Sequence, residues 1–142
     1  MFIGEFRHTL DDKGRLAVPV KFRMALVDGA VVTRGLDRSL FLYPIAGWNT
    51  LAAKLAALPL SQSDTRAFAR LMLAGAMDVD VDKSGRVMIP EYLRRYAGLA
   101  KAVVVTGLYD RLEIWDENAW VEYASKTEGA SNDIAERLGS VI

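Results

Sequence analysis

The sequence predicts an α+β fold made of two tandem copies of one β-β-α-β-β unit. The stretch LDDKGRLAVPVKFR at residues 10–23 returns 71 residues later as VDKSGRVMIPEYLR at residues 81–94. Further along the chain, Trp48 is matched by Trp120. Two copies are too few for a solenoid, but each unit can bury its apolar face against its twin, as two subunits do in a dimer. The chain is therefore expected to be a fused pseudo-dimer.

The first copy opens with two predicted strands on either side of a tight turn. Residues 2–10 are rich in β-prone side chains, and residues 15–18 form a short apolar segment closed by Pro19, which cannot donate to a strand ladder. Between them is the turn DDKG, in which Gly tolerates a positive φ and Asp can accept hydrogen bonds from its own downstream backbone. We therefore expect these two strands to pair as a β-hairpin.

The rest of the first copy predicts a helix and a second hairpin. The pattern VKFRMALV after Pro19 is helical until Asp28-Gly29 interrupts it. Strands are expected at residues 30–34 and 40–43, joined by a loop at residues 35–39. This copy therefore has the order β-β-α-β-β.

A helical hairpin at about residues 47–74 is predicted to connect the two copies. Apolar residues at helical spacing predict its first helix, which ends at Leu58-Pro59: Trp48, Leu51, Leu55 and Leu58. The second helix is expected at residues 61–74, with Ser61 or Ser63 as its N-cap. Its inward-facing residues are predicted to be Phe68, Leu71 and Met72.

The second copy repeats the order of the first. Strands are expected at residues 77–81, 86–89, 102–106 and 111–115, with a turn at 82–85, a helix at 91–96 stopped by Gly98, and a loop at 107–110. Asp116 is then expected to cap a helix that contains Trp120 and Tyr123, and a short helix is predicted at residues 133–138. The two repeats therefore span about residues 5–48 and 77–120.

Composition favours one compact, cytoplasmic domain over residues 1–142. A chain of 142 residues can bury roughly 68% of its unfolded surface. No apolar run approaches the roughly 20 residues of a membrane-spanning helix, and no secretory signal pattern begins the chain. There is no cysteine, which excludes disulfides and thiolate chemistry. With 18 basic and 18 acidic residues the net charge is zero, so any nucleic-acid role must come from local clustering.

The two Asp-x-x-Gly-Arg turns are the candidate binding site. In each turn the carboxylate of Asp11 or Asp82 can cap the turn amides and orient the guanidinium of Arg15 or Arg86 toward solvent. The simpler alternative is a hairpin turn with a surface ion pair of little energetic value. An arginine, which no turn requires, nevertheless recurs at the same place in both copies, and this favours a binding role.

Each turn lies in a basic cluster within the neutral chain. The first cluster contains no acid between its members and the second contains only Glu91: Lys13, Arg15, Lys21 and Arg23; Lys83, Arg86, Arg94 and Arg95. Such clusters suit phosphate contacts and readout of guanine by arginine, and a symmetric pair predicts repeated half-sites in the ligand. A solvated charged surface is the alternative.

The sequence predicts no catalysis, metal or cofactor. His8 is the only histidine, so one chain cannot assemble a histidine triad or a two-histidine metal site. The acids that alternate from Asp78 to Asp82 lack the Gly and Glu of a calcium loop, because Lys83 and Ile89 stand at those positions. Alternation of a half-exposed strand explains them better.

With these residues considered, the sequence resembles the MraZ family, bacterial transcriptional regulators encoded with cell-division and cell-wall genes. The resemblance covers nearly the whole chain, in the segments MFIGEF, LDDKGRLAVP, SLFLYP, VDKSGRVMIP and RLEIWDENAW. One copy alone would indicate only the wider AbrB-like (SpoVT-AbrB) superfamily of swapped-hairpin domains.

The resemblance implies that the two copies interleave their hairpins into one β-barrel, and that chains assemble into a ring such as an octamer. It further implies binding to short direct repeats in double-stranded promoter DNA of the protein's own gene cluster, and a place at the nucleoid. The DNA-contacting positions would be Asp11, Arg15, Asp82 and Arg86, within sites that also contain Lys13, Gly14, Lys83 and Gly85.

Two points stay open at this stage. The second turn has Lys83-Ser84 where the first has Asp12-Lys13, so the two copies need not contact DNA equally. A function of another class, a self-assembling scaffold or protein-interaction module whose basic turns bind an acidic partner, is the alternative to DNA binding.

Overall fold

A six-stranded antiparallel sheet forms the centre of the computed structural model, which describes residues 1–141. Its strand order is β1-β7-β8-β4-β3-β5, with the bounds β1 Phe2–Thr9, β3 Ala30–Arg34, β4 Leu40–Pro44, β5 Met77–Val79, β7 Ala102–Tyr109 and β8 Leu112–Asp116. A separate two-stranded sheet consists of β2 Arg15–Ala17 and β6 Arg86–Met88. The predicted α+β class is confirmed.

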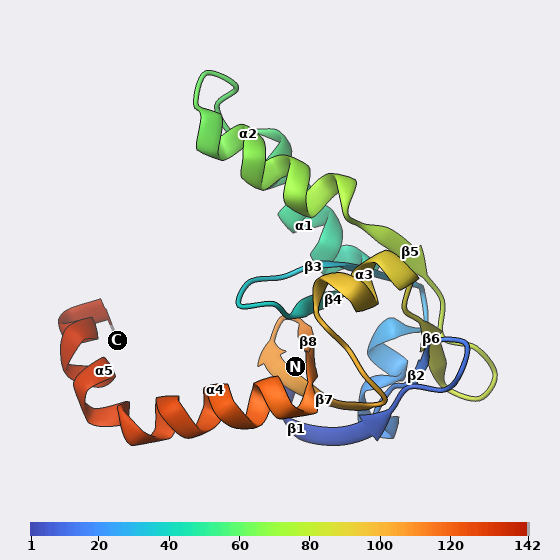
Figure 1. Ribbon diagram of the computed structural model, residues 1–142. Coiled ribbons are helices and arrows are strands. Elements are labelled where there is room, and N and C mark those ends of the chain that lie inside the picture. The colour runs from blue at the N-terminus through green and yellow to red at the C-terminus, as the bar shows by residue number, and fades with distance from the viewer. Residues whose placement is uncertain (142) are drawn as a thin grey trace.

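Helical segments lie inside each copy, between its second and third strands, and after its last strand (Figure 1). They are the 3-10 turns η1 Val20–Phe22, η2 Met24–Leu26 and η4 Gly139–Val141, the π-helical segment η3 Arg70–Ala74, and the helices α1 Ile45–Ala56, α2 Ser63–Ala69, α3 Glu91–Tyr96, α4 Glu117–Gly129 and α5 Ser131–Leu138. Asp116 caps α4 by accepting a hydrogen bond from the amide of Ala119 at 3.2 Å, as predicted.

The helix predicted directly after Pro19 is wrong in type, since the chain there makes two successive 3-10 turns. The equivalent segment of the second copy is the α-helix α3. The difference follows from the first turn. Glu91 places an acid at the positive end of the α3 dipole, whereas Val20 is β-branched and no acid lies in the first turn of η1.

Three details of the predicted second linker helix are also corrected. Neither Ser61 nor Ser63 is its N-cap, because α2 begins at Ser63 after Gln62, which forms no side-chain cap. The helix changes to π-helical geometry from Arg70. Met72 is buried, but Phe68 keeps 37% of its surface exposed, because α2 extends beyond the sheet instead of lying on it (Figure 1).

Strand pairing exchanges partners between the two copies. The predicted hairpin of residues 2–10 with 15–18 is wrong: β1 pairs with β7 and β2 pairs with β6, and a single bridge joins Leu10 to Leu16. The physical reason is length, since an eight-residue β1 finds an eight-residue partner in β7 while β2 has only three residues. β3 with β5 and β4 with β8 also pair across the copies. The interleaved pseudo-dimer is therefore confirmed.

The main core is shared by equivalent residues of both copies. Leu16 and Val18 of the first copy and their counterparts Val87 and Ile89 are each at most 2% exposed and belong to one cluster. Neither copy could bury these residues without the strands of the other.

Two smaller groups of apolar residues hold the helices that follow each copy against the sheet. In the first group, Leu55 and Met72 pack on Phe41 and Tyr43 of β4, with Trp48 beside them. On the other side, Trp120 and Tyr123 of α4 pack on Trp115, with ring centroids 5.2 and 5.1 Å apart. The tryptophans therefore serve packing, as predicted.

No helix within residues 1–141 is long and apolar enough to cross a membrane.

The β1–β7 pair can be tested at a glycine. A Cβ added to Gly107 would lie 2.5 Å from the carbonyl carbon of Phe2 and 2.7 Å from the Cα of Ile3, whereas nothing lies within 4 Å of one added to Gly129. We predict that Gly107→Ala lowers the free energy of unfolding by about 1–3 kcal/mol, because the clash is with backbone. Gly129→Ala, in a helix, should be neutral or stabilising by up to ~1 kcal/mol. Urea unfolding measures both, and equal effects would contradict the close approach of β1 to β7.

Candidate nucleic-acid interface

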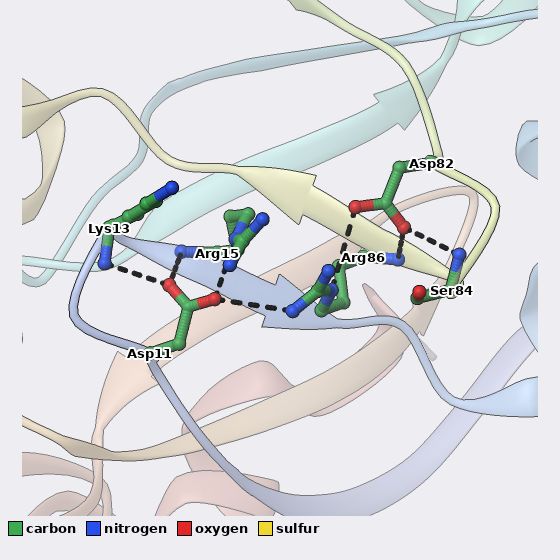
Figure 2. Close-up of polar contacts among 6 residues, drawn as sticks. All are labelled: Asp11, Lys13, Arg15, Asp82, Ser84 and Arg86. Carbon is green, nitrogen blue, oxygen red and sulfur yellow. Dashed lines mark hydrogen bonds and ion pairs between the residues drawn. The ribbon is translucent and has the colours of Figure 1, made fainter.

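The strands β2 and β6 form a short ribbon whose two faces differ. In their antiparallel register Leu16 lies opposite Val87, and both are buried. Since side chains alternate between faces, Arg15 and Arg86 share the outer face of the ribbon. Arg15 lies opposite Met88 and Arg86 opposite Ala17, so the two arginines are diagonal neighbours. The ribbon presents both guanidinium groups on one surface (Figure 2).

The first turn is closed by the carboxylate of Asp11. Its Oδ1 accepts hydrogen bonds from the backbone amides of Lys13 and Arg15, each at 2.9 Å. Its Oδ2 accepts a hydrogen bond from Nε of Arg15 at 2.6 Å. One carboxylate therefore caps the turn and fixes the arginine that follows it, as the sequence predicts.

The second turn has the same backbone geometry and a looser arginine contact. Oδ1 of Asp82 accepts hydrogen bonds from the amides of Ser84 at 2.8 Å and Arg86 at 3.0 Å. Nε of Arg86 lies 3.5 Å from Oδ2 of Asp82, which makes an ion pair longer than its counterpart. The pseudo-symmetry is thus close in the backbone and broken in the side chains.

A contact between the two turns accounts for this difference. Nη1 of Arg86 donates to Oδ2 of Asp11 at 3.3 Å, across 75 positions of sequence (Figure 2). Asp11 therefore holds both arginines of the ribbon. The sequence analysis missed this contact, because it depends on the register of β2 with β6 and no local pattern signals that register.

Each turn glycine is covered by an arginine from the other copy. Gly14 and Gly85 have φ of 80° and 78°, a region that favours glycine. A Cβ on Gly14 would lie 2.7 Å from Cζ of Arg94, and the guanidinium of Arg23 covers Gly85 in the same way. Nε of Arg23 and of Arg94 donates to the carbonyls of Val18 and Ile89, each at 2.9 Å. Arg23 and Arg94 thus brace the turns.

The other predicted basic residues lie differently. Lys13 and Lys83 are exposed on the turns themselves. Lys21 is exposed, with its Nζ 5.5 Å from the ring centroid of Phe6. Arg95 pairs with Glu91 on α3 at 2.9 Å. Lys21 and Arg95 make no hydrogen bond or ion pair with the turn carboxylates among residues 1–141, so the structure does not join them to the arginine pair.

The turn geometry keeps both carboxylates ionised. The hydrogen bond from the backbone amide of Arg15 is the main cause that lowers the pKa of Asp11 from 3.8 to about 2, with the Arg15 side chain and the Lys13 amide adding to it. The pKa of Asp82 is also lowered, chiefly by the backbone amide of Arg86. Both carboxylates therefore stay ionised to a lower pH than an aspartate without these contacts.

The arrangement suits recognition of an anionic ligand with paired acceptors. Arg15 donates only through Nε within the described structure and its side chain is 31% exposed, so both terminal nitrogens are left as donors. A fork of two N–H donors matches the O6 and N7 acceptors of guanine or two phosphate oxygens. Within residues 1–141 no group of three or more His, Cys, Asp or Glu residues could hold a metal ion.

The fold and the ribbon define a class of protein: a single-chain pseudo-dimer whose copies exchange strands and jointly present two carboxylate-held arginines. The family model of the MraZ protein, described as antitoxin-like, matches residues 1–71 and again residues 72–140. The boundary between the two matches falls in η3, within the helical segment that connects the two copies. The chain belongs to the MraZ family.

Relatives in this family are similar over almost their full length. Transcriptional regulator MraZ of Natranaerobius thermophilus is 49% identical over 138 residues, which cover 97% of this chain and 96% of the relative. The proteins of the same name from Acetivibrio thermocellus and Ligilactobacillus salivarius are 45% and 49% identical over the same shares.

Acid unfolding should report the Asp11 contacts. Because folding lowers the pKa of Asp11 from 3.8 to about 2, the stability that its ionised form contributes is complete above pH 4 and is lost as the pH falls from about 4 to about 2. Asp11→Asn should therefore flatten the decline of the unfolding free energy in that window, measured by urea titrations at several pH values.

The matched control is Asp12→Asn, whose carboxylate makes no hydrogen bond or ion pair within the described residues. It should keep the wild-type slope between pH 4 and pH 2. If Asp11→Asn and Asp12→Asn change the slope equally, Asp11 does not hold the turn as described.

Proposed function

We propose that this chain is a sequence-specific DNA-binding regulator of transcription that acts at the promoter of its own cell-division and cell-wall gene cluster. One observation carries the proposal: Arg15 and Arg86 stand on the outer face of one ribbon, each oriented by a carboxylate that the turn backbone fixes. The names of the relatives, which are transcriptional regulators and not enzymes, agree with it.

The dimensions of DNA favour entry of the ribbon into the major groove. That groove admits a two-stranded β-ribbon, and bidentate arginine contact with guanine is the commonest specific contact made there. In our proposal Arg15 and Arg86 read base edges, and the exposed Lys13 and Lys83 position the ribbon on the phosphates. Arg23 and Arg94 act indirectly, because they brace the turns.

The two turns are not expected to contribute equally. Arg15 has both terminal nitrogens free within the described structure, whereas Arg86 already donates Nη1 to Asp11. While that contact holds, Arg86 can offer DNA the second N–H of Nη1 and the two N–H groups of Nη2, but its guanidinium is less free to turn than that of Arg15. The second turn is more positively charged than the first, since Lys83 stands where the first turn has Asp12, and this charge offsets part of the weaker contact expected of Arg86. Arg15 is therefore proposed as the stronger base contact.

A neutral chain needs repetition to bind DNA firmly. The two turns carry Lys13, Arg15, Lys83 and Arg86 against Asp11, Asp12 and Asp82, a net charge of only +1, so the attraction of one ribbon to phosphate is modest. Several copies held together raise the effective concentration of the next ribbon, and avidity can exceed single-site affinity by ~10²-fold or more. We propose a ring of identical chains, whose ribbons face the same way around it and match short direct repeats. Such binding would place the protein at the nucleoid.

Arg15→Ala tests this proposal on a labelled DNA fragment from upstream of the gene cluster. Loss of one bidentate contact costs about 1–3 kcal/mol of discrimination. We therefore expect the Kd for the promoter fragment to rise about 5- to 150-fold, more if several copies bind together, while the Kd for scrambled DNA changes less. Arg15→Lys should retain non-specific binding but lose most of the preference, since lysine lacks the fork.

Lys126→Ala is the charge-matched control, because this exposed lysine pairs with Glu122 on α4, away from the ribbon. It should leave both Kd values unchanged. Equal affinity for promoter and scrambled DNA, unaffected by Arg15→Ala, would favour the scaffold alternative.

A further inference from the structure

An apolar side chain stands beside Arg15 on the outer face of the ribbon. Met88 lies directly opposite Arg15 in the pairing of β2 with β6, and it is 44% exposed. Its neighbours in the chain, Val87 and Ile89, are both buried. Because side chains alternate along a strand, burial of Val87 fixes Met88 on the face that carries the arginines. Met88 therefore belongs to the surface that the proposed function places against DNA.

The outer face of the ribbon consists of side chains of only two kinds. Arg15 and Arg86 supply guanidinium groups, whose side chains are each 31% exposed. Ala17 and Met88 supply apolar surface beside them. The middle residue of each three-residue strand points inward, so β2 and β6 add nothing else to this face. A ligand that matches the face must offer hydrogen-bond acceptors and, next to them, an apolar group.

The major groove of DNA offers both kinds of group. Its guanine edge presents the acceptors O6 and N7, and the C5-methyl of thymine is the apolar group that a base pair presents there. Residues directly opposite in an antiparallel pair have Cβ atoms roughly 5 Å apart, and successive base pairs are about 3.4 Å apart along the helix. Arg15 and Met88 are therefore spaced to contact adjacent base pairs.

The two ends of the ribbon differ in apolar reach. In the shared register of the copies Met88 corresponds to Ala17, which lies opposite Arg86. A methionine side chain is long, flexible and polarisable, so it adapts to the surface that it meets. An alanine ends at its Cβ and cannot follow a base edge into the groove. The apolar contact is therefore expected at the Arg15 end of the ribbon.

We propose that Met88 is a specificity-determining residue, which packs on the C5-methyl of a thymine next to the guanine that Arg15 binds. This inference rests on the proposed function, because it names a second base that the same ribbon reads. Cytosine lacks the methyl group and presents an amino donor in the major groove, for which Met88 has no strong acceptor. Met88 thus favours thymine over cytosine at this position.

Deoxyuridine isolates the methyl group, because it keeps the base pairing of thymine and lacks only the C5-methyl. The Kd of the full chain is measured for the labelled promoter fragment and for the same fragment with deoxyuridine in place of every thymine. For the wild type, the uracil fragment should have a Kd about 4-fold higher for each methyl group that the protein buries.

Substitutions of Met88 show whether this residue makes the contact. Met88→Ala should raise the Kd for the thymine fragment and bring the ratio of the two Kd values close to 1. Met88→Leu, which keeps the apolar surface, should retain the wild-type ratio, whereas the polar Met88→Gln should lose it. Because Met88 is exposed, all three variants should keep the wild-type circular dichroism.

Packing of Met88 against the aliphatic part of Arg15 is the competing structural role. That role predicts that Met88→Ala raises both Kd values by the same factor and leaves their ratio at the wild-type value, a result that would overturn the proposal. A wild-type ratio close to 1 would overturn it as well.

Met77→Ala is the matched control, since Met77 is 42% exposed but lies on β5 of the large sheet. It should keep the wild-type ratio, and loss of the ratio in Met77→Ala as in Met88→Ala would contradict a contact made by Met88. If the wild type binds promoter and scrambled DNA equally, the proposed function fails and this inference fails with it. If binding is specific but independent of the methyl groups, only the inference fails.

Discussion

The exchange of strands between the two copies is the constraint on which the rest of the structure depends. β1 takes its partner from the second copy and β2 takes β6, so neither copy has a complete sheet alone. The shared core follows, because Leu16 and Val87 are buried only where the ribbon lies over both halves. The arginine pair follows too. Arg15 and Arg86 come from different copies and share a face only through this register, and Asp11 reaches Arg86 only across it.

Fusion of the copies into one chain also leaves each half free to differ. In the first copy Val20 and Met24 are 76% and 79% exposed, whereas the equivalent Glu91 and Arg95 form an ion pair. The turns differ in the same way, with a close Asp11–Arg15 contact of 2.6 Å and a looser Asp82–Arg86 contact of 3.5 Å. A dimer of identical chains cannot differ between its halves, because one sequence serves both.

Local features of the fold and site were predictable from the sequence, and long-range partners were not. The turn at Asp11, the cap at Asp116 and the positive φ of Gly14 and Gly85 depend on residues within four positions, so their signals are visible in the sequence. The same turn signal wrongly predicted a hairpin, because it shows that the chain reverses and not which strand pairs next. Arg23 and Arg94 were identified as basic residues, but their role as braces of the opposite turns depends on packing between the copies.

The broken symmetry of the chain gives the proposed regulator a direction. A ribbon with a perfect two-fold axis would match inverted half-sites, because its two arginines would be equivalent. Here Arg15 is free at both terminal nitrogens and Arg86 is shared with Asp11, so the ribbon has two distinguishable ends. Copies of a polar ribbon held in one orientation would match direct repeats in DNA, which is the arrangement that the proposed function requires.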